Sequence, residues 1–558
     1  MKYVAGSFIL ALMLSFGTAF AADEHTHSHA TTASLGTVNF PSGCNGVDAE
    51  FTRAVALLHS FGYEESRRAF NAVIAKDAKC AMAYWGIAMT FYHPLWAAPT
   101  PQEFANGAAA AQRAAQLAPD SAQVTPAAPR VAPATLRERG YIAAIGAFYR
   151  DAERQSHGVR AQAYSDAMRR LADELPDDHE AQIFYALSLL GAAPPDDTTF
   201  ANQKKAAAIL NALLPLEPQH PGIAHYMIHS FDYPQLAADA LPAAHAYSRI
   251  APDSPHALHM PSHIFTRLGL WNDSIASNLA SAASARALVA QRHPGATAMD
   301  ALHALDYLEY AYLQIGDEAS ARQVLAEAAA AKTFDEGAFQ AGYALAAIPA
   351  RYALERRDWS AAAQLEPSNA ALPWERFVYA SATTYFAQAI GAARSDQLDR
   401  ARAALRQLDT IHAALQKTPV PGPYDWTGQV ESTRLAATAW LDYAEGRRDD
   451  ALAHARAAAD LAELTGKHPV TPGAILPARE LLGDLLLEMQ QSAAALAEYE
   501  AALREAPNRF NSLYGAARAA ALSNNPTRAA ELYAALLAQC VGQSPRPELM
   551  QARAAVSG

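Results

Sequence analysis

Residues 478–508, ARELLGDLLLEMQQSAAALAEYEAALREAPN, contain two alanine- and leucine-rich segments with the apolar spacing of amphipathic helices. The small residue Ala495 allows the second predicted helix to approach the first closely, and Pro507 ends the unit. The other positions of the predicted packing face are Leu482, Gly483, Tyr499 and Ala502. The stretch therefore predicts one antiparallel helix pair.

This order of residues resembles the tetratricopeptide repeat, a helix–turn–helix unit of 34 residues, except that Arg479 replaces its leading aromatic residue. A degenerate copy follows with Tyr514, Gly515, Ala529 and Tyr533, and Pro218 and Pro252 end two earlier units at the same 34-residue offset. We therefore expect an all-α, right-handed α-solenoid of such repeats with a concave groove. An N-terminal solenoid over residues 44–365 would be followed by C-terminal repeats over residues 366–545.

Both ends of the chain lie outside the predicted repeats. Residues 1–21 combine a lysine, an apolar stretch and a small-residue cleavage site, which is typical of a secretory signal peptide. Residues 22–43, which include His25, His27 and His29, predict a disordered tail, and residues 546–558 predict a flexible one. No later segment has the 18 consecutive apolar residues of a membrane span, so we expect no transmembrane segment in the mature chain and a periplasmic or secreted location.

Charge and motifs exclude several classes of function. The net charge of −12 is spread along the chain without a basic block, so nucleic acid is not an expected partner. The sequence contains no phosphate-binding glycine loop, no GxSxG and no HExxH, so an enzymatic activity is neither indicated nor excluded. Three cysteines fit an oxidising compartment. Cys44 and Cys80 flank the first predicted hairpin and are expected to form a disulfide, which leaves Cys540 over.

Two histidine pairs are separated by one repeat length. His225 and His229 in HYMIH lie 34 residues before His259 and His263 in HMPSH. Residues one period apart occupy the same position on stacked neighbouring helices, so the four imidazoles should face one another across the groove. His256 lies one turn upstream on the same predicted face.

Clustered neutral imidazoles are common ligands of transition metals. We therefore expect His225, His229, His259 and His263 to bind one copper, zinc or iron ion, with His256 and Asp232 as further ligands or as orienting groups. Neighbouring repeats offer a second tier of candidates, namely His303, Asp306, Glu180, His59 and His93. The last two lie beside aromatic residues, which favours packed histidines over ligands.

The stretches LLHSFGYEESRRAF (57–70), HYMIHSFDYP (225–234) and HALHMPSHIFTRLGLWNDS (256–274) together resemble a bacterial family of secreted tetratricopeptide-repeat proteins with HYxIH and HxxHMPSHIF motifs. The resemblance covers most of residues 44–490. It implies an exported repeat protein and brings no settled activity with it.

Three functions fit the sequence. The first is an exported solenoid that binds a transition metal in its groove, with a role in metal handling. The second is a scaffold that holds a peptide or a partner protein without metal. The third is a metal-dependent oxidase, oxygenase or hydrolase, in which the histidines leave one coordination position open.

Overall fold

The computed structural model describes residues 34–557, except for 96–97, 119–133, 152, 195–196, 336–338, 369, 421, 423 and 543. The predicted signal peptide, 1–21, and residues 22–33 of the predicted tail lie outside the described residues. The described residues contain helices and no strand, and Thr297 and Phe334 form one isolated β-bridge. The predicted all-α fold of tetratricopeptide-type helix pairs is confirmed.

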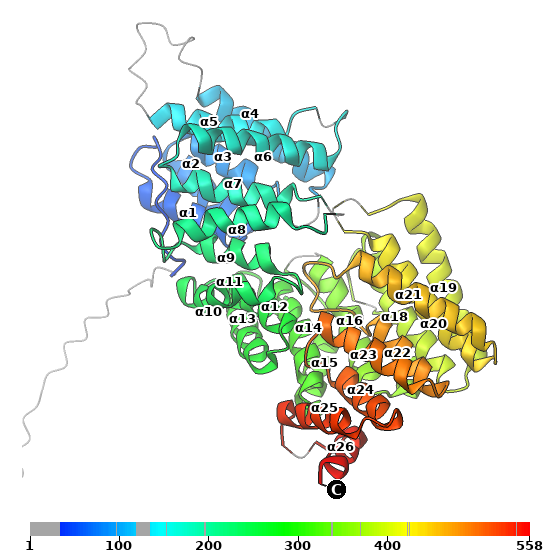
Figure 1. Ribbon diagram of the computed structural model, residues 1–558. Coiled ribbons are helices and arrows are strands. Elements are labelled where there is room, and N and C mark those ends of the chain that lie inside the picture. The colour runs from blue at the N-terminus through cyan, green and yellow to red at the C-terminus, as the bar shows by residue number, and fades with distance from the viewer. Residues whose placement is uncertain are drawn as a thin grey trace, which may run out of the picture. The chain divides into compact units, whose positions relative to one another are not determined.

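Consecutive helices pack side by side along the chain (Figure 1). The N-terminal helices are α1 (Asp48–His59), α2 (Tyr63–Lys76), α3 (Ala81–Met89), α4 (Pro101–Leu117), α5 (Ala134–Phe148), α6 (His157–Glu174), α7 (His179–Gly191) and α8 (Ala201–Leu213). The middle helices are α9 (Pro221–Phe231), α10 (Leu241–Ile250), α11 (Pro255–His259), α12 (Pro261–Arg267), α13 (Trp271–Arg292), α14 (Met299–Gln314), α15 (Glu318–Ala330), α16 (Phe339–Glu355) and α17 (Trp359–Ala363). The C-terminal helices are α18 (Val378–Ala393), α19 (Leu398–Lys417), α20 (Trp426–Ala444), α21 (Arg448–Thr465), α22 (Ala478–Glu488), α23 (Ser492–Glu505), α24 (Phe510–Leu522), α25 (Pro526–Gln539) and α26 (Pro547–Ser557).

The repeat that predicted the fold packs as expected. Tyr499 on α23 is fully buried between α22 and α24. A Cβ atom at Gly483 would lie 3.0 Å from the Tyr499 ring, and one at Gly515 would overlap the ring. The two glycines therefore make room for one buried aromatic residue, which is how small and large residues alternate between close-packed helices.

Side-chain caps start several of the helices. The carboxylates of Asp178, Asp317, Asp358 and Asp425 each accept a hydrogen bond from the backbone N–H three residues later. These bonds satisfy amide groups that a helix leaves unpaired in its first turn. At two of the connections Gly269 and Gly316 adopt positive φ angles of 65° and 71°, which a residue with a side chain rarely adopts.

The disulfide between Cys44 and Cys80 is present, with the two Cα atoms 4.8 Å apart, and it ties the segment before α1 to the start of α3. Cys540 is a free thiol. No helix in the described parts of the chain is long and apolar enough to cross a membrane.

Three predicted boundaries are wrong. Residues 34–43 are not disordered, because Leu35, Val38 and Phe40 are buried against the helices. Residues 546–558 are not a flexible tail: α26 occupies Pro547–Ser557 and buries Leu549. The apolar core continues across residue 365, and the described chain from residue 34 onwards forms a single unit. In each case the apolar side chains are too few to form a recognisable sequence pattern, but they still pack against buried surfaces of the neighbouring helices.

Candidate metal centre

Six histidines gather where four helices meet. His225 and His229 lie on α9, His256 and His259 on α11, His263 on α12, and His303 on α14. Met260 lies between α11, which ends at His259, and α12, which begins at Pro261, so the HMPSH motif spans the junction of two short helices. Helix α12 packs against α9 and α14, which brings the two pairs that lie 34 residues apart onto facing surfaces.

The six rings form two groups of three and do not converge on one point. The first triad is His225, His229 and His256, and the second triad is His259, His263 and His303. Within each triad the potential ligand atoms lie within 4.8 Å of one another. The expectation of one ion shared by the two HxxxH pairs is therefore corrected, because each pair recruits a third histidine of its own.

Three nitrogen distances inside the triads match those of a coordination sphere. The Nε2 atom of His225 lies 3.1 Å from the Nε2 atoms of both His229 and His256. The Nε2 atoms of His259 and His263 lie 3.0 Å apart. Two nitrogens bound to one ion at about 2.0–2.1 Å are separated by about 2.9–3.3 Å when the bond angle is between 90° and 109°.

Hydrogen bonds behind the rings fix the protons of the second triad. His263 Nδ1 donates to the carboxylate of Asp232 at 3.0 Å. His259 Nδ1 donates to the side-chain oxygen of Asn278 at 2.7 Å, and that amide is oriented by its own N–H bond to the Ser274 carbonyl at 2.8 Å. In a neutral imidazole only one nitrogen carries a proton, so both Nε2 atoms present lone pairs. Two lone pairs therefore face each other with no proton between them.

In the first triad one tautomer is fixed in the same way. His225 Nδ1 donates to the backbone carbonyl of His59 at 2.6 Å, so its Nε2 atom carries a lone pair. One lone pair faces the nitrogens of both His229 and His256, and it can accept one linear hydrogen bond. A cation among the three nitrogens could bind the His225 lone pair together with its two neighbours.

Burial keeps these rings uncharged. His225 is fully buried, and burial lowers its pKa to about 3. Burial also lowers the pKa values of the other five, with added repulsion between neighbouring imidazoles for the four that shift furthest: His229, His256, His259 and His303. The pKa of His263 falls less because Asp232 opposes the effect of burial. The expectation of an open groove surface is corrected, since four of the six rings are buried and only His229 and His256 are partly exposed.

Asp232 orients a ring and does not reach the nitrogens as a ligand. Its carboxylate accepts hydrogen bonds from His263, from Arg267 at 2.9 Å and from Lys467 at 3.3 Å. Burial opposes ionisation of Asp232, but the charges of Lys467 and Arg267 outweigh it and hold the pKa well below its usual value. A carboxylate that fixes the tautomer of a liganding histidine is a recurrent feature of metal sites.

A loop from the C-terminal half covers the triads. This loop joins α21 to α22 and contains Lys467 and Val470, and the Val470 carbonyl accepts a hydrogen bond from Tyr307 at 3.1 Å. Beneath it lies a small cavity whose wall contains members of both triads. Its lining includes His229, His256, Met260, His263, Asp300 and His303, with Pro469 and Val470 on the loop side.

Glu180 and His59 belong to a separate cluster with His220. Glu180 accepts hydrogen bonds from His59 Nε2 at 2.9 Å and from His220 Nε2 at 3.1 Å. The remaining ring nitrogens accept from the Tyr226 hydroxyl at 2.9 Å and from the Gly222 N–H at 3.1 Å. Every proton has an acceptor, so this cluster is complete without a cation. Its ligand atoms lie within 4.8 Å of one another, as in the triads, but Glu180 lies in neither triad and so does not join the site predicted for it.

The remaining second-tier residues divide. His303 belongs to the second triad. Asp306, expected beside it, is buried in an ion pair with Arg351 at 3.2 Å and does not contact the rings. His93 packs against Tyr63 with ring centroids 4.5 Å apart, so its interpretation as a packed histidine fits its position. Asn278 and Lys467, which help to build the site, could not be found from the sequence because no spacing connects them to the histidines. Met260 lies within the HMPSH motif, but the sequence analysis did not single it out.

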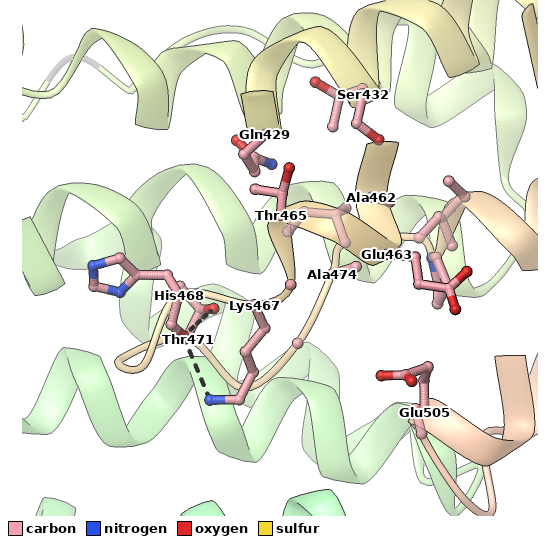
Figure 2. A pocket seen from close by; sticks show the side chains of 18 of the residues that line it. Gln429, Ser432, Ala462, Glu463, Thr465, Lys467, His468, Thr471, Ala474 and Glu505 are labelled. Atoms are coloured by element: carbon pink, nitrogen blue, oxygen red, sulfur yellow. Dashed lines mark hydrogen bonds between the residues drawn. The ribbon is translucent and has the colours of Figure 1, made fainter. Parts of the chain in front are cut away.

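A second, larger recess lies beside the same loop. It is lined by residues that include Tyr343, Tyr424, Trp426 and Arg479. In Figure 2 Gln429 and Ser432 lie on one helix, and Lys467, His468 and Thr471 lie on the loop across from them. Lys467 therefore stands between the two sites, because its Nζ atom bonds both the His468 carbonyl and Asp232.

No protein-family model and no curated protein matches the sequence. Solved structures with low similarity include a human IFIT1 dimer with m7Gppp-AAAA, at a TM-score of 0.35 and 11% identity, over 82% of this chain and 90% of that one. A second is the APC/C hetero-tetramer Cut9-Hcn1, at 0.30 and 12% identity, over 91% and 96% of the two chains. A third is yeast Tom70, at 0.27 and 12% identity, over 91% and 95%. The fold assignment therefore rests on this chain's own helix pairs.

Proposed function

We propose that this protein is an exported helical-repeat protein that binds a transition metal through its buried histidines, with a role in metal handling. The observation that carries the proposal is the 3.0 Å contact between His259 Nε2 and His263 Nε2. Both nitrogens are deprotonated by the hydrogen bonds behind them, so a cation supplies the attraction that the pair lacks.

Three ways to relieve that contact exist, and the site disfavours two of them. Protonation of one ring is opposed by burial, which lowers the pKa values of both histidines. Rotation of a ring would break the bond from Nδ1 to Asp232 or to Asn278 and leave a buried polar group unpaired, at a cost of about 1–3 kcal/mol. A copper, zinc or iron ion needs neither change, because neutral imidazole is its ligand.

Metal content is the decisive measurement. The untagged protein would be stripped with chelator, offered copper, zinc and iron separately, desalted and analysed for metal. His25, His27 and His29 would be Ala in every sample, because a histidine-rich tract binds metal loosely. We expect a tightly bound ion in the parent and a reduced content in the double variant His259→Leu/His263→Leu.

His220→Gln is the matched control, because it alters a buried histidine of comparable surroundings whose protons are all satisfied. It should keep the parental metal content. Circular dichroism would show that each variant is folded. Equal metal in parent and double variant, or none in the parent with any of the three metals, would overturn the proposal.

The recess beside α20 favours a second candidate function, a scaffold that holds a peptide. Its wall combines the aromatic rings of Tyr424 and Trp426 with the charged groups of Lys467, Arg479 and Glu463. Aromatic anchors with a few charged groups suit an extended peptide. Selection of binders from a random peptide library on the parent, followed by loss of binding in Trp426→Ala, would support this role. Binders that ignore the substitution would refute it.

Catalysis is a third candidate. Three histidines on one ion leave a coordination position for water or dioxygen, as in metal-dependent oxidases, oxygenases and hydrolases. Turnover of phenols and of activated esters by the metal-loaded protein, absent from the stripped protein, would support it. The same low rate in both samples would refute it.

A further inference from the structure

We propose that the two triads hold two metal ions that face each other across the cavity and share a small anionic ligand. This inference rests on the proposed function and adds the number of ions, the donor set of each and the class of ligand between them. The first ion would be held by His225, His229 and His256. The second would be held by His259, His263 and His303.

The donor sets are separate. Within the triads the measured Nε2 contacts are 3.0–3.1 Å, the separation expected of two ligands on one ion. The ligand atoms of each triad lie within 4.8 Å of one another, and the groups that this limit defines among the described residues do not mix the two triads. Each triad also has its own buried anchor, since His225 is fixed by the His59 carbonyl and His259 by Asn278.

Both triads face the same cavity. Its wall includes His229 and His256 from the first triad and His263 and His303 from the second. His225 and His259 do not line it and lie behind the others. An ion with three imidazole ligands keeps a fourth position open. Because two ligands of each ion lie in the cavity wall, both open positions would point into the cavity.

Charge favours an anion in that space. Two divalent ions would bring four positive charges, and Arg267 and Lys467 add two beside the single negative charge of Asp232. Among the described residues that line the cavity, Asp300 is the one carboxylate. A water molecule bound to such ions readily loses a proton to solvent, and the resulting hydroxide can bridge two metals.

The donors also favour copper. Each ion would have three imidazoles and no carboxylate, and Met260 contributes a thioether to the cavity wall. Imidazole with thioether suits copper better than it suits magnesium, calcium or manganese, which take oxygen ligands. Copper also permits a direct test, because each isolated copper(II) ion has one unpaired electron, whereas two copper(II) ions that share a hydroxide pair their spins.

The experiment is a titration of the stripped protein with copper(II), followed by metal analysis and by electron paramagnetic resonance. We expect two bound ions per chain, with a signal that rises during the first equivalent and falls during the second. His225→Leu/His229→Leu and His259→Leu/His263→Leu should each bind one ion and give the full signal of one copper(II). The parent titration alone tests the pairing if either variant fails to fold.

Other outcomes overturn the inference in distinguishable ways. One ion per chain that either double variant abolishes would mean a single shared site, which refutes the pair and leaves the proposed function standing. If two copper(II) ions bind and the electron paramagnetic resonance signal of the second adds to that of the first, the two sites are isolated, which refutes the shared ligand. No copper in the parent, with no zinc or iron either, would refute both the pair and the proposed function.

Discussion

Replacement of Asp232 with Asn should weaken metal binding through a proton that moves on His263. The carboxylate accepts from His263 Nδ1 through Oδ2 and from Arg267 through Oδ1. Arg267 and Lys467 can only donate, and Lys467 shares the Oδ2 side with His263 at 3.3 Å. Because the Arg267 bond is shorter, at 2.9 Å, and Lys467 also bonds the carbonyls of His468 and Pro469, the amide oxygen of Asn should stay with Arg267 and the NH2 group should face His263. His263 would then accept at Nδ1 and carry its proton on Nε2, where it blocks the metal.

The size of the effect follows from the cost of restoring the liganding tautomer. That tautomer would set the Nδ1–H of His263 against the amide NH2 group and leave a buried donor unpaired, which costs about 1–3 kcal/mol. At about 1.4 kcal/mol per factor of ten, metal affinity should fall about 5- to 150-fold.

The assay is competition with a chelator of known affinity, for zinc and for copper. Asp306→Asn is the matched control, because Asp306 is an equally buried carboxylate that pairs with Arg351 and touches no histidine of the triads. The control should keep its metal affinity within about a factor of two, because substitutions at distant, independent sites usually change a free energy additively to within about 0.3–0.5 kcal/mol. Equal affinity in both variants would refute the tautomer argument.

Further predictions concern stability. Burial lowers the pKa of His225 from 6.5 to about 3, so below pH 6.5 the unfolded chain binds a proton that the metal-free folded chain does not. The free energy of unfolding should therefore fall by about 1.4 kcal/mol per pH unit for this residue, down to about pH 3. Urea unfolding that shows no loss of stability below pH 6.5 would contradict this prediction. Glu309 is fully buried with no hydrogen-bond partner for either oxygen among the described residues, and burial raises its pKa well above the usual value. Glu309→Leu should therefore raise the free energy of unfolding at pH 7 by about 1–3 kcal/mol. A lower denaturation midpoint in this variant would count against the prediction. Reduction of the Cys44–Cys80 disulfide, which closes a loop of 36 residues, should lower the free energy of unfolding by about 4 kcal/mol through the chain entropy of the unfolded state. Thermal denaturation with and without reductant measures this loss, and an unchanged midpoint would contradict it.

The sequence predicted the helix pairs and most of the histidines of the two triads because both depend on periodicity. Gly483 and Tyr499 sit at fixed offsets within one repeat, and their packing follows from that offset. His225 and His259, and His229 and His263, sit at corresponding positions of neighbouring repeats, so their helices face each other. The pairing of Cys44 with Cys80 was also accessible, because they were the two cysteines beside one predicted hairpin.

The grouping of the histidines depended on tertiary structure. The position of α14 relative to α11 decides that His303 joins His259 and His263, and no repeat offset encodes it. Asp232 and Asp306 are both acids close to histidines in the sequence. The structure separates their roles, because Arg267 and Lys467 hold Asp232 against His263, whereas Arg351 holds Asp306 away from the rings.

By itself, then, the sequence determined the local elements, the repeat and the face on which the imidazoles lie, since these depend on residues one turn or one period apart. Only the tertiary structure decided which nitrogens carry protons. Asn278 lies 19 residues from His259, and Lys467 lies 235 residues from Asp232, so their hydrogen bonds follow no sequence pattern. Those bonds leave the lone pairs of His259 and His263 facing each other, because a neutral imidazole has one proton and its position is set by whatever packs behind the ring.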